Sequence, residues 1–454
     1  MKQNKPKEQP KQKNNKHPHN KRSMVLYYIL LGVTVVLAFL FLPGSFVKEN
    51  QGALISVVTG IGLDREKDSS DYHITVQIVT PDISGQNQQK VASFCDKGKT
   101  IVDALNNASL KIGKTIGFDH CSVIAIGESL TGENIFPLLD HFYRRGNISL
   151  NTVLVNVKGS ACDLITQTTE VSNLSSGNIQ NNFTFNQNFF GSSKISTLGM
   201  FFNEYFKRGK SVIVAEINMK EDETKTEAAG NEQCGDSSKT SSSGAGDKGS
   251  SGGGSSSSSS EGSGSEELQK VNIIQNQGES IVYKEGKAVA RANNQVNYGF
   301  NYLDNRVKYG ILSGEHINDD NLHDATVTML ISNSTVDFKP VVDKETNRFV
   351  LKANIKLYGE ITEICCDNTE KISRSYKDLL TDEVKTALEK KVKEDVDVAV
   401  QFCKLNNVDP LNIEDYFYKL KTKDYKEMIK KLAINNNFLE YCTVEASVEV
   451  FHQD

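Results

Sequence analysis

The pattern of apolar and polar positions is most marked near the start of the chain, where residues 24–42 (MVLYYILLGVTVVLAFLFL) contain no charge. As a helix rising about 1.5 Å per residue, this run reaches roughly 28 Å, close to the thickness of a bilayer's hydrocarbon core. A cleaved secretory signal and a buried core helix are the alternatives. A signal's apolar part is shorter, about 7–15 residues, and ends in a small-residue cleavage site, whereas this run passes into Pro43 and Gly44. We therefore expect an uncleaved transmembrane anchor over residues 24–43.

The segment before this run, residues 1–23, carries one acid, Glu8, against eight basic residues: Lys2, Lys5, Lys7, Lys11, Lys13, Lys16, Lys21 and Arg22. The positive-inside rule keeps such a segment in the cytoplasm and places the bulk of the chain on the outer face of the membrane. Its Pro, Asn and Gln residues leave too little apolar surface to fold, so we expect a disordered basic cytoplasmic tail. Beside a membrane this tail meets anionic lipid, and we expect the bilayer and no nucleic acid as its partner.

Residues 51–175 alternate between strand-like and helix-like patterns and predict an N-terminal α+β domain. Segments 54–62 and 72–79 predict a β-hairpin, in which the second strand is half-buried, with alternate apolar positions facing the core and His73, Thr75 and Gln77 facing away. Thr100 is a candidate N-cap and Gly113 a candidate stop for the helix between them. Further strands are expected near 121–126 and 150–157, and further helices near 134–145 and 160–167.

Residues 176–310 are expected to form a middle domain with a disordered Ser/Gly-rich insertion at 221–267. The insertion has the composition of a flexible linker. It lacks the preceding strand and the Gly-Lys-Ser/Thr of a phosphate-binding loop. Strand-like segments on both sides predict that it occupies one loop, and Glu285-Gly286 is typical of a hairpin turn. The Asn- and Phe-rich stretch 182–190 has the residue types of a sugar or peptide site, but core packing is the favoured interpretation.

Residues 311–454 predict a C-terminal α+β domain. Strands are expected at 326–331, 335–338, 349–357 and 442–450, and residues 380–403 have the spacing of a long amphipathic helix. A helical segment is expected near 413–432. The whole pattern predicts an α+β fold, with an N-terminal transmembrane helix followed by three small α+β domains that have mainly antiparallel sheets flanked by helices.

Composition narrows the function classes. The 454 residues carry a formal charge of −5, and because the tail is basic, the remainder is more acidic than this value. An acidic ectodomain lacks the electrostatic footprint of a nucleic-acid-binding protein. At 38% hydrophobic residues the chain is globular outside the tail and the insertion, with length for two or three domains.

The eight cysteines are scattered along the chain: Cys95, Cys121, Cys162, Cys234, Cys365, Cys366, Cys403 and Cys442. An extracytoplasmic location permits disulfides, but several of these cysteines occupy apolar positions of expected strands or helices, so free buried thiols are the favoured interpretation. No Cys-x-x-Cys or His/Cys ligand spacing indicates a zinc site. The sequence calls for no cofactor and no metal.

A catalytic site would need a nucleophile with its base, paired carboxylates or metal ligands. Asp119-His120-Cys121 is the one dense cluster of such residues, and a thiol-imidazole dyad is conceivable there. Neighbours in a strand point to opposite faces, however, so His120 and Cys121 cannot easily meet. Adjacent Cys365 and Cys366 are expected to be two separate thiols. We therefore expect no enzyme activity and no catalytic residues.

Several short motifs follow one another along the chain in the order of a known family. In the N-terminal half the resemblance lies in residues 58–64 (VTGIGLD), 72–81 (YHITVQIVTP), 98–104 (GKTIVDA), 118–128 (FDHCSVIAIGE) and 139–144 (LDHFYR). In the C-terminal half it lies in residues 281–289 (IVYKEGKAV), 349–363, the long helix ahead of 409–411 (DPL) and 444–450 (VEASVEV). Each motif is a short structural pattern, and the specificity lies in their order and spacing. In this order and spacing the chain resembles the Ger(x)C family.

The resemblance implies a non-catalytic C subunit of a nutrient germinant receptor, acting in spore germination at the outer face of the spore inner membrane. Its implied partners are the membrane-embedded A and B subunits of the receptor. The lipobox cysteine usual in the family is missing, and the span at 24–42 replaces it. The 221–267 tract is an insertion. The alternative is an extracytoplasmic ligand-binding or envelope-assembly module unrelated to spores.

Overall fold

This computed structural model describes residues 21–41, 55–66, 69–80, 90–145, 147–167, 175–189, 194–224, 269–304, 307–318, 322–365 and 379–453. The predicted tail up to residue 20 and almost all of the predicted insertion lie outside these residues. So do Cys234 and Cys366. The chain divides into two compact units, Met1–Ile55 and Ser56–Asp454.

The first unit contains helix α1 (Lys21–Phe41), which has 21 residues. Its side chains from residue 24 to residue 37 are exposed. Within the part of the chain that the structure describes, no helix is both long enough and apolar enough to cross a membrane. This finding gives no support to the transmembrane span predicted at 24–43, which remains a prediction.

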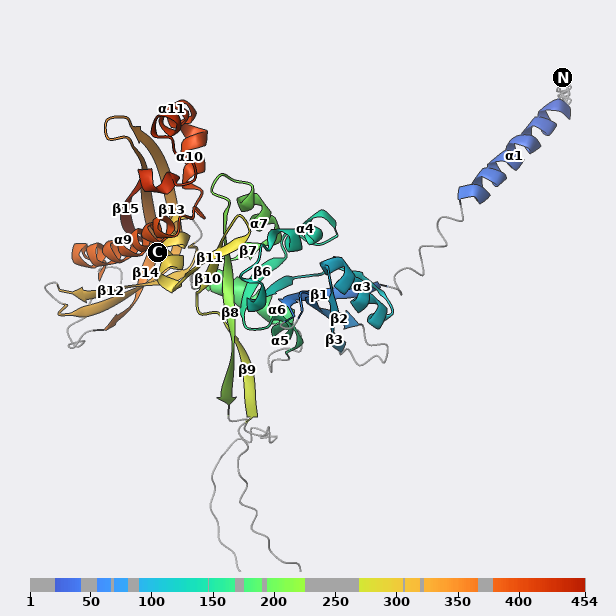
Figure 1. Ribbon diagram of the computed structural model, residues 1–454, viewed down its shortest axis with the longest axis horizontal. Coiled ribbons are helices and arrows are strands. Elements are labelled where there is room, and N and C mark those ends of the chain that lie inside the picture. The colour runs from blue at the N-terminus through green and yellow to red at the C-terminus, as the bar shows by residue number, and fades with distance from the viewer. Residues whose placement is uncertain are drawn as a thin grey trace, which may run out of the picture. The chain divides into compact units, whose positions relative to one another are not determined.

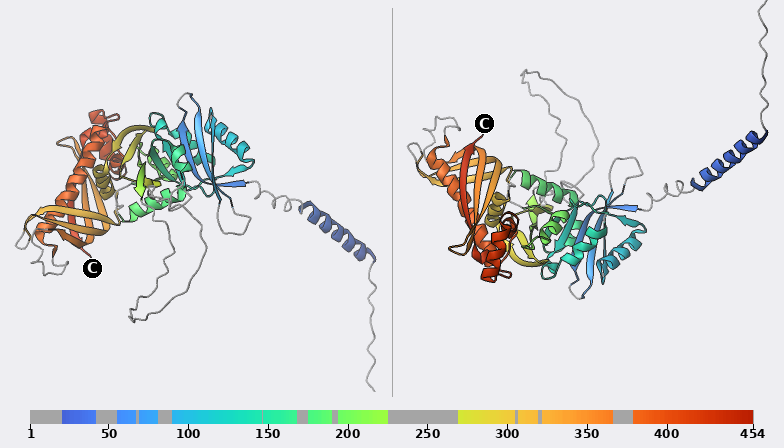
Figure 2. Two further views of the ribbon diagram at one scale, coloured as in Figure 1. Left: turned by 90° about the horizontal axis from the view of Figure 1, so that it is seen from below. Right: turned by 90° about the horizontal axis from the view of Figure 1, so that it is seen from above.

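The second unit is built on a mixed sheet of eleven strands, in which β11-β10-β8-β6-β5-β1-β2-β3 lie side by side (Figures 1 and 2). The strands are β1 (Ile55–Arg65), β2 (Tyr72–Thr80), β3 (Lys90–Gly98), β4 (Thr115–Gly117), β5 (Val123–Gly127), β6 (Val153–Lys158), β7 (Ser196–Thr197), β8 (Ser211–Thr224), β9 (Gln269–Gln275), β10 (Ser280–Lys284) and β11 (Lys287–Ala292). Strands β1, β5, β6 and β8 run parallel at its centre. The sheet also continues across the boundary predicted between residues 175 and 176.

Helices cover both faces of this sheet, as parallel strands require. One face packs against α3 (Ile101–Ile112), α4 (Phe136–Arg145) and α7 (Leu198–Tyr205). The other face packs against α5 (Ala161–Thr166) and α6 (Ser175–Phe189). Consecutive residues of β5 are consequently all buried, because their side chains point to alternate covered faces.

Several local predictions are confirmed. Strands β1 and β2 pair as an antiparallel hairpin. Thr100 caps α3 through the Asp103 N–H, and Gly113 ends this helix with a φ of 68°. Glu285 and Gly286 both have positive φ in the tight β10–β11 turn, which favours glycine there.

The prediction that β2 is half-buried is wrong, because its polar face is covered as well. Thr75 and Gln77 are buried beneath α5 and the start of α6. The Gln77 amide donates to the Ile165 carbonyl (2.9 Å) and to the Ser175 hydroxyl (2.8 Å), and its oxygen accepts from the Ser176 hydroxyl (2.8 Å). A polar strand face can therefore be buried at little cost, since each polar group has a partner.

Strand β3 and helix α6 were not expected from the sequence.

Asp64, near the end of β1, holds the opposite end of α5. Its carboxylate accepts hydrogen bonds from the backbone N–H groups of Ala161 (3.1 Å) and Cys162 (2.8 Å). Burial is the main cause of the raised pKa of Asp64, while these two hydrogen bonds oppose the rise. A side-chain methyl at position 127 would overlap the Asp64 carboxylate, so Gly127 is required by this close approach.

The strands that flank the predicted insertion pair with each other. Strands β8 and β9 form an antiparallel ladder that extends to Thr224 and Gln269 and projects from the sheet (Figure 1). Residues 225–268 join the two ends of the ladder. The start predicted for the insertion, residue 221, is wrong, because residues 221–224 pair with β9 as the end of β8.

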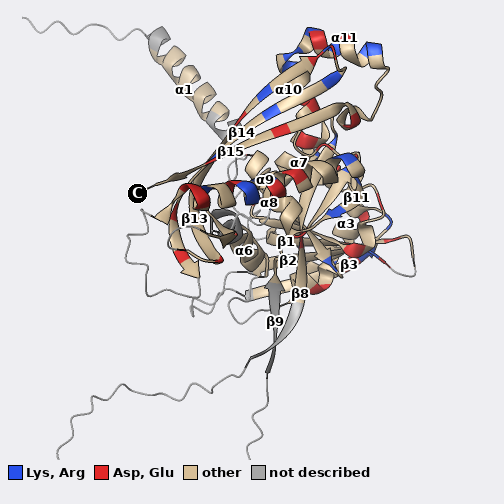
Figure 3. Cartoon of the chain, turned by 90° about the vertical axis from the view of Figure 1, so that its left-hand side faces the viewer, with Lys and Arg blue, Asp and Glu red and all other residues tan. Residues whose placement is uncertain are grey.

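The C-terminal region contains a four-stranded sheet in the order β12-β13-β14-β15. Its elements are α8 (Asn294–Leu303), β12 (Gly310–Ile317), β13 (Ala325–Asp343), β14 (Arg348–Cys365), α9 (Asp382–Leu405), α10 (Ile413–Leu420), α11 (Thr422–Leu432) and β15 (Cys442–His452). The two strands expected near 326–331 and 335–338 are one strand with an irregularity between Ile331 and Asn333. The apolar stripe of α9 packs on the sheet, and Figure 3 shows acidic and basic residues alternating with others along this helix.

Asp409 joins the two sheets. Its buried carboxylate accepts from the N–H groups of Ile413 (2.8 Å) and Glu414 (3.0 Å), and its own N–H donates to the Ser211 hydroxyl at the start of β8 (3.0 Å). The Lys284 ammonium donates to the Asn407 carbonyl (2.5 Å), and the Arg208 guanidinium lies 3.6 Å from the centre of the Tyr418 ring. Burial raises the pKa of Asp409 to about 6.

The Gly127→Ala change should destabilise the protein by about 1–3 kcal/mol, because the added methyl displaces the Asp64 carboxylate from α5. Gly132→Ala is the matched control, since a methyl there meets nothing within 4 Å, and its effect should stay within about 0.5 kcal/mol. Urea unfolding of the purified chain measures both. Equal stabilities of the two variants would contradict the role given to Asp64.

The Asp409→Asn change should alter the pH dependence of stability. Between the ordinary pKa of 3.8 and about 6, the folded protein holds a proton on Asp409 that the unfolded chain has released. The contribution of this group therefore falls as pH rises through that window, by on the order of 2–3 kcal/mol, and is constant above it.

The free-energy difference between wild type and Asp409→Asn should follow this fall in urea unfolding at pH 4 to 8. Asp337→Asn, at an exposed carboxylate, controls for the loss of one charge. A wild-type minus Asp409→Asn difference that does not change with pH would refute the assignment.

Candidate functional site

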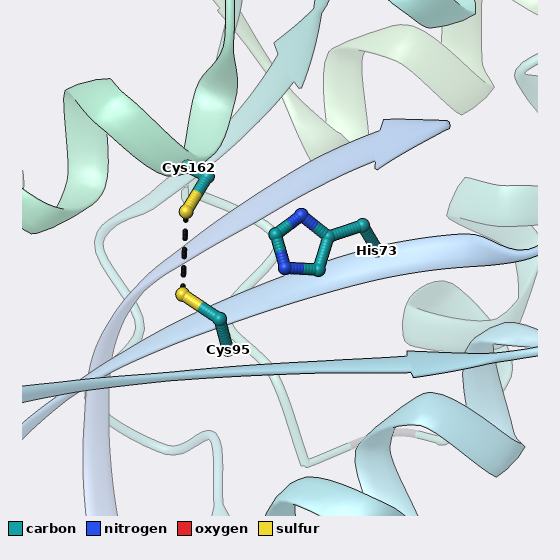
Figure 4. Close-up of side chains that lie close together, drawn as sticks. All are labelled: His73, Cys95 and Cys162. Carbon is teal, nitrogen blue, oxygen red and sulfur yellow. Dashed lines mark hydrogen bonds between the residues drawn. The ribbon is translucent and has the colours of Figure 1, made fainter. Parts of the chain in front are cut away.

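Three side chains from three separate elements converge on one point of the second unit: His73 of β2, Cys95 of β3 and Cys162 of α5 (Figure 4). The two sulfur atoms lie 3.2 Å apart. One ring nitrogen of His73 and the two sulfurs all lie within 4.8 Å of one another. All three residues are half-buried.

The β2–β3 ladder places two of these side chains. Thr75 is directly opposite Cys95 in the antiparallel register. His73 is two residues before Thr75, so its side chain is on the same face of the sheet and diagonal to Cys95. The Thr75 hydroxyl lies 3.3 Å from the Cys95 sulfur.

Helix α5 brings the third side chain to this face. Asp64 accepts the backbone N–H of Cys162 itself, and Gln77 donates to the Ile165 carbonyl near the end of the helix. Both ends of α5 are thus fixed to the strands below it. The Cys162 thiol is held over Cys95 as a result.

The site favours a thiolate on Cys95. The hydrogen bond from Cys162 is the main cause that lowers the pKa of Cys95 to about 6, and the nearby His73 and Lys111 charges contribute in the same direction. The same contact raises the pKa of Cys162, with burial adding to the rise. The contact between the two sulfurs thus shifts the two pKa values in opposite directions.

A cleft of about 780 Å³ opens beside His73. It is lined by Asp64, Arg65, Glu66, His73, Glu128, Ser129, Gly159, Ser160 and Asp163. These residues come from the carboxyl ends of β1, β5 and β6, from the start of β2 and from α5. The carboxyl ends of parallel strands are the usual place for a ligand in sheets of this kind.

The sequence pattern gave no sign of this cluster. His73, Cys95 and Cys162 are far apart in the chain and match no short ligand motif. His73 was expected on a face of β2 that turns away from the core. The signal that was available is the polar face of β2, whose side chains need partners once that face is covered.

The Asp119-His120-Cys121 segment, considered above as a catalytic cluster, is not part of this site. Asp119 and His120 are exposed in a turn before β5. Cys121 is buried, its thiol donates to the Val123 carbonyl (3.4 Å), and burial raises its pKa to about 12. The six described cysteines are all free thiols, and Cys365 is exposed at the end of β14.

Two family models match the chain in order. "Spore germination protein N-terminal domain" matches residues 54–219, and "Spore germination B3/ GerAC like, C-terminal" matches residues 278–451. The unmatched interval between them contains the low-complexity insertion.

Two relatives from Bacillus subtilis (strain 168) are similar to the chain. Spore germination protein KC is 27% identical over 172 residues, which are 36% of this chain and 42% of that protein. Spore germination protein B3 is 28% identical over 117 residues, which are 25% of this chain and 31% of that protein. The chain thus matches less than half the length of these curated relatives.

A solved structure, "Crystal Structure of the GerBC protein", aligns with 87% of this chain and 97% of its own, with a TM-score of 0.44 and 15% identity. The family assignment rests on the two family models, which together cover more than half of the chain. The chain therefore belongs to the Ger(x)C family of spore germination proteins, in agreement with the resemblance of its sequence.

Proposed function

We propose that the chain is a non-catalytic, membrane-anchored C subunit of a nutrient germinant receptor that takes part in spore germination. The observation that carries the proposal is the ordered match of both family models across residues 54–219 and 278–451. The relatives named spore germination proteins KC and B3 support the same role. Membrane-embedded A and B subunits of the receptor are the proposed partners.

Helix α1 is the proposed anchor, with the bulk of the chain on the outer face of the spore inner membrane. At about 1.5 Å per residue its 21 residues reach roughly 31 Å, which is close to the thickness of the hydrocarbon core. Its exposed side chains between residues 24 and 37 are almost entirely apolar, and such a surface needs a cover.

The polar groups of α1 also suit a bilayer. The Thr34 hydroxyl donates to the carbonyl oxygens of Leu30 (3.1 Å) and Leu31 (2.8 Å), so it needs no water. Tyr27 and Tyr28 lie near the end that follows the basic tail, where aromatic residues favour the membrane interface. Together these features support a single span with a cytoplasmic N-terminus.

The positions of His120 and Cys121, the candidate thiol-imidazole dyad, support the proposal of a non-catalytic role. His120 is exposed, whereas the Cys121 thiol is buried and bonded to a backbone carbonyl. The high pKa of Cys121 that results from burial keeps it a neutral thiol, which is a weak nucleophile.

Deleting the gene should abolish or strongly slow germination with at least one nutrient, because a receptor that lacks a subunit cannot signal. Loss of optical density in a spore suspension after nutrient addition measures this. Restoring the intact gene is the control. An unchanged response to every nutrient tested would falsify the germinant-receptor role.

The anchor can be tested separately with tags at each end of the chain. Protease added to intact protoplasts should remove the C-terminal tag and spare the N-terminal one, since the domains are proposed to lie outside. A Val35→Lys change, which places a charge near the middle of α1 at a cost of about 2.5–3.5 kcal/mol, should release protein from the membrane fraction. Val35→Leu is the matched control, and cleavage of the N-terminal tag would invert the proposed topology.

A further inference from the structure

We propose that His73, Cys95 and Cys162 bind a thiophilic divalent metal ion of the zinc(II) type. They offer one imidazole and two sulfur ligands from two consecutive strands, β2 and β3, and from α5 further along the chain. Sulfur and imidazole ligands select zinc-like ions over magnesium or calcium, which prefer oxygen. The Ger(x)C assignment plays no part in this inference.

The distances fit a metal better than a direct bond between the sulfurs. With zinc–sulfur bonds of about 2.3 Å at a tetrahedral angle, two sulfurs are about 3.8 Å apart, and the observed separation is 3.2 Å. A disulfide would require them to close to about 2.0 Å. The sulfur–sulfur distance therefore has to change less for metal coordination than for a disulfide. Rotation of the two cysteine side chains can supply this change.

The ligands are held in place before any ion arrives. The register of β2 and β3 fixes His73 and Cys95 on one face. Asp64 and Gln77 fix the two ends of the short helix that carries Cys162. Ligands set on such supported elements lose little conformational freedom on binding.

The surroundings provide access and favourable charge. His73 lines the cleft beside the cluster, so an ion and a fourth ligand from solvent can enter there. Asp64 and Asp163 line the same cleft and favour a cation, while the Arg65 guanidinium in the same lining is paired with Glu133. Two neighbouring ammonium groups are already paired, Lys97 with Glu66 and Lys111 with Asp96.

The first experiment measures zinc binding to the full chain, purified in detergent and kept reduced, in competition with a chromophoric chelator. Wild type should bind one equivalent per chain. Cys95→Ser and Cys162→Ser should each weaken binding at least about 100-fold, since even outer partners of a metal ligand contribute 10–100-fold. Cys365→Ser changes an exposed cysteine outside the cluster and should bind as wild type does.

Cobalt(II) in place of zinc gives a second measurement. Wild type should show sulfur-to-cobalt charge-transfer absorption and the visible bands of a tetrahedral ion. His73→Gln should change the visible bands and weaken binding, whereas His120→Gln, at an exposed histidine, should change neither.

A third measurement needs no variant and so does not depend on whether the substitutions fold. Zinc should protect Cys95 and Cys162 of the wild-type chain from alkylation, while Cys365 reacts with or without the ion. Failure to bind zinc, equal binding by Cys95→Ser and Cys365→Ser, or the absence of protection would each overturn the proposal. None of these outcomes bears on the germination role, which the deletion tests by itself.

Discussion

The attachment of α5 to the strands below it is the interaction on which the N-terminal half of the second unit depends. A buried carboxylate, Asp64, accepts two backbone N–H groups at the start of this six-residue helix, and the Gln77 amide donates to a carbonyl near its end. A helix this short has no stability of its own. Its position is therefore set by tertiary hydrogen bonds, and these also cover a polar strand face that would otherwise be open to water.

The same device recurs where the two sheets meet. Asp409 is buried and accepts the N–H groups of Ile413 and Glu414 at the start of α10, while its own N–H reaches the Ser211 hydroxyl. Each aspartate is costly to bury, and each is compensated by backbone donors that lie at a fixed distance. The positions of α5 and of α10 thus both depend on hydrogen bonds to one buried carboxylate.

These constraints bring together the residues of greatest chemical interest. The parallel strands β1, β5 and β6 end at the cleft, and α5 places Cys162 above Cys95 beside it. Residues 225–268, which contain most of the insertion predicted at 221–267, are remote from this arrangement in the topology, because they join the ends of the projecting β8–β9 ladder. A family member can therefore carry such an insertion without disturbing either sheet.

The sequence by itself determined the local elements and the family. The caps Thr100 and Gly113, the Glu285-Gly286 turn and the apolar stripe of α9 are local or periodic signals, and each depends on residues a few positions apart. Order and spacing of such elements sufficed to identify the family, although they left β3 and α6 unpredicted.

Only the tertiary structure decided which faces are buried and which distant residues meet. The alternation in β2 predicts one solvent-exposed face, but both faces are buried in the structure. Gln77 on the polar face has hydrogen-bond partners on α5 and α6. No pattern within β2 can reveal these partners. Cys95 and Cys162 are 67 residues apart in the chain. Their meeting with His73 follows from strand register and from the carboxylate of Asp64, and both are long-range contacts.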